Sequence, residues 1–169
     1  GNSCILNINR GALMNIFVLD KNPKIAAQMA CDKHCVKMIL ESAQLLCSPY
    51  PPGTAPYRRT HYNHPCSKWV RESEDNYLWL LDYASSLCEE YHLRYGRYHK
   101  SSQIIQWCKA NIYKLNFKQT KLTSFPQCMP SEYKNPNVVI AYRNYYMGEK
   151  AYFAKWKAGG VPEWWVNEQ

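Results

Sequence analysis

Two Asn-Pro pairs, at residues 22–23 and 135–136, constrain the fold most, because each combines a helix N-cap with a proline at the first helical position. After the first pair, apolar residues recur at three- and four-residue steps, which predicts a long helix over residues 23–47. After the second pair, an aromatic-rich pattern predicts a helix over residues 136–157. The fold is therefore expected to be mostly α.

The middle of the chain predicts two further helices, one over residues 67–94 and one that begins near Ser101. A short β-branched and aromatic run, Asn15–Leu19, predicts one strand or extended segment. With 169 residues, the chain has the length of a single domain. We expect one domain of about four main helices over residues 14–169, with Met14 as the natural start and residues 1–13 as an upstream or tag-derived segment outside the fold.

The composition is cationic and aromatic. The formal net charge is +8 and aromatic residues make up 14% of the chain, a combination typical of proteins that meet phosphates and flat rings. No run of about 18 apolar residues is present, so no membrane span is expected. The eight cysteines are scattered and no secretory signal precedes them, which favours free thiols in a reducing compartment and a cytoplasmic location.

The strongest local signal covers residues 91–102, where a helix ends, a glycine turn follows and the next helix starts. Basic side chains alternate there with tyrosines, and the new helix start offers backbone amides to an anion. This pattern predicts a phosphate site formed by Arg94, Arg97, His99 and Lys100. The alternative is structural, because cations at a helix C-terminus also complement its dipole.

A second basic cluster lies in residues 57–71, within a Pro-rich loop and the helix start that follows it. Cations at a helix start oppose its dipole and favour an external anion. We assign Arg58 and Arg71 to the same phosphate-binding function.

Four side chains are candidates for acid–base chemistry. Asp32 falls within the apolar stripe of the 23–47 helix, so it needs a partner and is either half of a buried salt bridge or a carboxylate with a tuned pKa. His34 and Glu41 share the opposite, polar face. The prediction is that His34 or His64 is the general acid or base, oriented by Asp32 or Glu41.

Residues 31–35 and 61–66 contain Cys and His side chains, which are zinc ligands, so we considered a zinc site formed by these two groups. No Cys-x-x-Cys pair is present, so no metal and no other cofactor is expected. Phosphate-loop, dinucleotide-binding and common hydrolase motifs are also absent, which makes the familiar nucleotide hydrolases and dehydrogenases improbable.

Four segments, Met14–Asp20, Cys31–Glu41, Tyr91–Ser101 and Met129–Lys134, resemble a small, uncharacterised protein family encoded by tailed bacteriophages, including marine ones. The resemblance implies a phage source and hence the host cell cytoplasm.

Three functions remain open. The first is binding of a phosphate-bearing ligand, a nucleotide or nucleic acid, through the basic and aromatic helix junction. The second is an enzyme that acts on a nucleotide or DNA base with His and Asp/Glu chemistry. The third is a non-catalytic inhibitor or adaptor of a host protein, steered by the basic surface.

Overall fold

The computed structural model describes residues 14–157 and 160–166. This part of the chain forms a mostly helical single domain in which no β-strand is present. The expected upstream segment, residues 1–13, lies outside the described residues. The helices, in chain order, are α2 (Pro23–Met29), α3 (Asp32–Cys47), α4 (Pro65–Glu72), α5 (Glu74–Tyr95), α6 (Ser102–Ala110) and α7 (Val138–Glu149), with 3-10 turns η1 (Ile112–Lys114) and η2 (Ser131–Tyr133).

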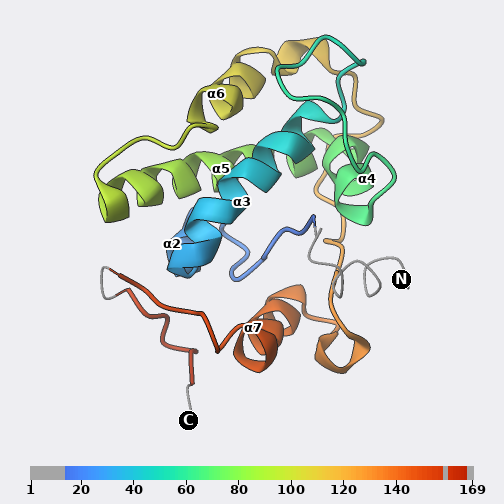
Figure 1. Cartoon of the computed structure of the whole chain (residues 1–169). Coiled ribbons are helices and arrows are strands. Elements are labelled where there is room, and N and C mark those ends of the chain that lie inside the picture. The colour runs from blue at the N-terminus through green and yellow to red at the C-terminus, as the bar shows by residue number, and fades with distance from the viewer. Residues whose placement is uncertain (1–13, 158–159, 167–169) are drawn as a thin grey trace.

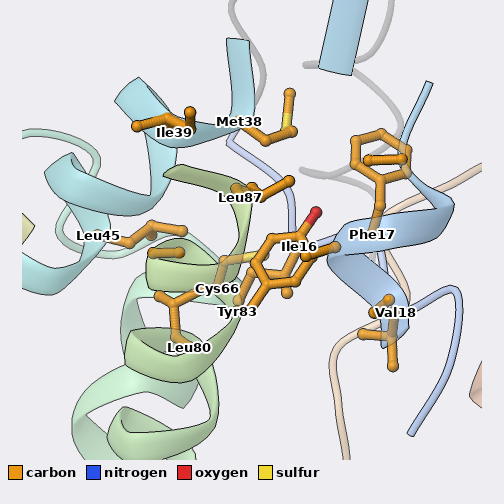
Figure 2. Packing of buried hydrophobic residues seen from close by; sticks show 14 of the residues in the cluster. Ile16, Phe17, Val18, Met38, Ile39, Leu45, Cys66, Leu80, Tyr83 and Leu87 are labelled. Atoms are coloured by element: carbon orange, nitrogen blue, oxygen red, sulfur yellow. The ribbon is translucent and has the colours of Figure 1, made fainter. Parts of the chain in front are cut away.

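The longest helix, α5, packs against α2, α3, α4 and α6 (Figure 1). Residues 15–19, which we call the extended segment after the sequence prediction, are buried but form neither a strand nor a helix, so the predicted strand is absent from this described segment. Figure 2 shows Ile16 facing Tyr83 and Leu87 of α5. Phe17 contacts the rings of α7. The extended segment thus packs between α5 and α7, while α3 also contacts α7 directly through His34 and Tyr146.

The predicted helix over residues 23–47 is two helices, because Ala30 and Cys31 are extended, with ψ of 133° and 163°. Partners far away in the chain stabilise the break. The carbonyl of Lys155 accepts from the amide of Asp32 at 2.8 Å, and Arg94 donates to the carbonyl of Ala30 at 2.7 Å. The spacing of apolar residues in the sequence does not reveal these contacts.

The predicted helix over residues 67–94 is likewise divided, at Ser73, whose φ and ψ are −145° and 157°. The Ser73 side chain accepts from the amide of Asn76 and so caps α5. The segment after η1 supplies the next acceptors, since the carbonyl of Gln119 binds the amide of Glu74 at 3.0 Å. The other end of α5 agrees with the sequence: Gly96 has φ of 68° and terminates the helix.

Tyrosine accounts for much of the core. Five tyrosines are less than 2% exposed: Tyr77, Tyr83, Tyr142, Tyr145 and Tyr146. Adjacent residues point in different directions from a helix, yet Tyr145 and Tyr146 of α7 are both fully buried. Phe17 contacts both rings, while Trp164 and Trp165 contact Tyr146 from the C-terminal segment.

The last predicted helix is shorter than expected and ends at Glu149 rather than near residue 157. None of the described helices has the length and apolar character needed to cross a membrane. The seven described cysteines are all free thiols.

Candidate functional site

A small pocket lies where α3, the extended N-terminal segment and the end of α7 meet. Its volume is about 30 Å³, which is room for a water-sized group. We call it the Glu41 pocket. It is lined by Asn15, Phe17, His34, Lys37, Met38, Glu41, Tyr145 and Lys150.

The Glu41 carboxyl is buried and is held at one oxygen. The residue is 5% exposed, and its Oε1 accepts from the backbone amide of Asn15 at 3.3 Å. The other oxygen, Oε2, lies 3.9 Å from Nζ of Lys37 and has no hydrogen-bond partner among the described residues. Glu41 therefore has one oriented oxygen and one buried oxygen whose hydrogen-bonding capacity is not used by the described residues.

Burial raises the pKa of Glu41 to about 7, against the opposing effects of Lys37, the Asn15 amide and Lys150. Burial also lowers the pKa of the Lys150 amine, and the charge of Lys37 adds to that effect. Nζ of Lys150 lies 4.8 Å from the centroid of the Tyr145 ring. The pocket thus combines a carboxyl that titrates near neutral pH with two amines, which is a combination suited to proton transfer.

Asn15 is fixed by its side chain. Its Nδ2 donates to the carbonyl of Cys128 at 2.9 Å, and its Oδ1 accepts from the hydroxyl of Tyr142 at 2.7 Å. These bonds orient the residue whose amide faces Glu41. Glu41 was a candidate from the sequence, but Asn15 and Lys150 were not, because they lie far from it in the chain.

His34 lies in the pocket but is not suited to the predicted acid–base function. Its ring is buried, its Nδ1 lies 2.7 Å from the hydroxyl of Tyr146, and burial lowers its pKa to about 3. A ring with this pKa stays neutral at physiological pH. His64 does not line the pocket: it caps α4, accepting from the amide of Cys66 at 3.0 Å.

Asp32 and Arg94 form a largely buried structural salt bridge. Oδ1 of Asp32 lies 3.1 Å from Nη1 of Arg94, and Oε1 of Glu90 lies 3.0 Å from Nη2. Arg94 also donates to the carbonyls of Ala30 and Gln28. Of the two alternatives for Asp32, the structure shows the buried salt bridge and not the pocket carboxylate. The phosphate-binding prediction for Arg94 is corrected, because its side chain is engaged within the fold.

A larger groove, about 870 Å³, lies between α3, the loop around residues 56–60 and the start of α6. We call it the α3–α6 groove. Lys37 lines both this groove and the Glu41 pocket, so the two adjoin. Arg58 and Lys100, which the sequence placed in separate clusters, both line the groove and are exposed.

His99 also lines the groove but is already engaged. Its Nδ1 accepts from the amide of Ser101 at 3.0 Å, so its Nε2 carries the proton and donates to the carbonyl of Val36 at 3.1 Å. Because both ring nitrogens are used, His99 fastens the start of α6 to α3. The phosphate-binding prediction for His99 is corrected accordingly.

The remaining two predicted phosphate ligands lie outside the groove. Nε of Arg97 donates to the hydroxyl of Tyr91 at 3.1 Å. Arg71 donates to the carbonyl of Tyr62 and stacks on its ring at 3.8 Å, beside a different pocket. The six predicted cations therefore do not form one site.

Residues 14–106 match the model of a family described as pyrimidine dimer DNA glycosylase. The match covers more than half of the chain, and the chain belongs to this family. No curated protein and no solved structure matches it at the significance threshold. The sequence resemblance was to an uncharacterised family, and a match to a family with a described activity does not confirm it. The phage source stays a prediction. The matched residues include Glu41, Lys37, Arg58 and Lys100.

Proposed function

We propose that this chain is a DNA glycosylase that acts on pyrimidine dimers, with Glu41 as its catalytic carboxylate. The family description supports the reaction and the substrate. The observation that carries the assignment of the residue is the buried Glu41 carboxyl, oriented by the Asn15 amide at 3.3 Å within the matched segment.

The reaction breaks the bond between a base and C1′ of its sugar. The base leaves with the bonding electrons, so positive charge develops on the sugar ring, as in other glycoside cleavages. An ionised Glu41 stabilises that charge, and it accepts a proton from the water that bonds to C1′. The departing base takes up a proton in turn. A pKa of about 7 keeps the carboxylate populated at neutral pH while leaving it basic.

The DNA contacts follow from the shape of the site. A pocket of about 30 Å³ does not accommodate a base, so only the edge of the sugar approaches Glu41. The strand then continues along the adjoining α3–α6 groove, where Lys37, Arg58 and Lys100 meet its phosphates. In this proposal the DNA follows the α3–α6 groove, which includes Lys100 of the 91–102 helix junction but not Arg94 or Arg97.

The test uses a duplex oligonucleotide that carries one cyclobutane pyrimidine dimer, with alkali after the reaction to reveal base loss. Glu41→Gln should lower the single-turnover rate roughly 10²-fold or more, with DNA affinity retained. Glu89→Gln, an exposed glutamate on α5, is the matched control and should keep the wild-type rate. Wild-type protein that leaves dimers intact, or a fully active Glu41→Gln, overturns the proposal.

A further inference from the structure

Three side chains with zinc-binding chemistry lie together outside the Glu41 pocket. They are His64, Cys66 and Cys128, all buried, and their ligating atoms lie within 4.8 Å of one another. Sγ of Cys66 lies 3.8 Å from Sγ of Cys128, although the two residues are 62 positions apart. Of the Cys and His residues that were considered for zinc from the sequence, only His64 and Cys66 belong to this cluster.

We propose that His64, Cys66 and Cys128 bind a zinc ion. Two thiolates bound to one tetrahedral zinc at about 2.3 Å stand roughly 3.8 Å apart, the separation that the two sulfurs have here. Sulfur and imidazole nitrogen are the donors that zinc prefers. Three protein ligands leave the fourth position of the tetrahedron to a water molecule.

The charge balance also favours zinc at this buried position. Binding releases the two thiol protons to solvent, and the two thiolates then cancel the charge of the ion. With a neutral imidazole, the site carries no net charge, which avoids the cost of burying an unpaired charge.

The backbone holds the ligands in place before any metal arrives. His64 is the N-cap of α4 and Cys66 lies in its first turn. The Cys128 amide donates to the hydroxyl of Tyr142 at 3.2 Å, and its carbonyl accepts from Asn15. Zinc would therefore tie α4 to the residue that orients Asn15. The inference does not depend on the proposed glycosylase activity.

Zinc binding changes one hydrogen bond in a measurable way. Nδ1 of His64 accepts from the Cys66 amide at 3.0 Å. When one ring nitrogen donates its lone pair to zinc, the other carries the proton, so the Cys66 amide loses this acceptor. The amide signal of Cys66 in an NMR spectrum should shift on zinc addition.

A second cysteine pair serves as an internal control. Sγ of Cys47 and Sγ of Cys108 lie 3.7 Å apart, but these residues belong to no group of three potential ligands among the described residues. The two pairs share sulfur separation and burial. They differ in that the Cys66–Cys128 pair lies beside His64, whereas the Cys47–Cys108 pair belongs to no such group among the described residues.

The experiment measures zinc in the full chain, purified under reducing conditions and titrated with zinc chloride against a chromophoric chelator. We expect one zinc per chain, loss of that zinc in Cys66→Ser and in Cys128→Ser, and retention in Cys47→Ser. Cobalt added to metal-free wild-type protein should give a thiolate-to-cobalt charge-transfer band, a readout that needs no variant to fold. The proposal is overturned if wild-type protein lacks stoichiometric zinc or the cobalt band, or if Cys128→Ser keeps its zinc. A Cys66–Cys128 disulfide that persists in protein purified under reducing conditions also overturns it.

Discussion

The backbone amide of Asn15 lies 3.3 Å from Oε1 of Glu41 and joins the extended N-terminal segment to the middle of α3. The amide dipole favours the ionised carboxyl, whereas burial favours the neutral one, and burial has the larger effect on the pKa. The result is a carboxyl with a pKa of about 7. Small changes around Glu41 should therefore change its protonation at neutral pH.

Glu41→Gln should stabilise the protein at high pH. The pKa of Glu41 is raised from 4.5 to about 7 on folding, so the folded state binds the proton more tightly, and ionisation costs stability as the pH rises through 7. The variant should gain up to about 3 kcal/mol in free energy of unfolding at pH 8, and none of this gain at pH 4. Urea denaturation at both pH values measures it. Equal effects at the two pH values would contradict the burial of an ionised Glu41.

Lys150→Met should shift the pH profile of base removal upwards. The proposed reaction needs ionised Glu41, so the single-turnover rate should rise with pH and level off above about 7. The charge of Lys150 lowers the pKa of Glu41, so its removal raises that pKa and the midpoint of the profile. Lys134→Met, on an exposed residue that does not line the pocket, should leave the midpoint unchanged. A lower rate with an unchanged midpoint would show that Lys150 acts through substrate contact instead.

Helix starts and stops with local chemical causes were predictable from the sequence. The Asn22 cap and the left-handed Gly96 are examples, and both are present. The interruptions at Cys31 and Ser73 were not predictable. Each depends on a backbone partner distant in the chain, the carbonyl of Lys155 for one and the segment around Gln119 for the other.

The candidate site was predictable only in part. Spacing along α3 places His34, Lys37 and Glu41 on one polar face, and a polar face is expected to meet solvent. Lys37 does so, with a side chain that is 49% exposed, but His34 and Glu41 are buried. They are buried because the extended segment and α7 contact them, and a helical wheel of α3 contains neither element. On the apolar side Ile39 is buried as expected, whereas Val36 and Leu40 are 39% and 42% exposed.

Arg94→Gln should destabilise the protein and leave DNA affinity unchanged. The Arg94 side chain is 4% exposed and pairs with Asp32 and Glu90, so its loss strands two carboxylates and two carbonyls. Breaking a buried pair in this way typically costs about 3–5 kcal/mol. Thermal and urea denaturation measure the loss. Arg97→Gln is the control, because this exposed residue belongs to the same predicted phosphate site but its side chain bonds only to Tyr91 among the described residues. It should cost far less, and equal losses would contradict the structural assignment of Arg94.

The double variant Arg58→Gln and Lys100→Gln should weaken DNA binding and make it less dependent on salt. Both side chains line the α3–α6 groove. Each phosphate contact that is lost removes about 0.9 from the slope of log affinity against log salt, so the slope should fall by roughly 1.8 for two contacts. Fluorescence anisotropy at several salt concentrations measures it. Lys121→Gln, which removes an exposed cation outside the groove, should leave the slope unchanged. If Lys121→Gln lowers the slope as much per charge as the double variant, the DNA responds to net charge rather than to this groove.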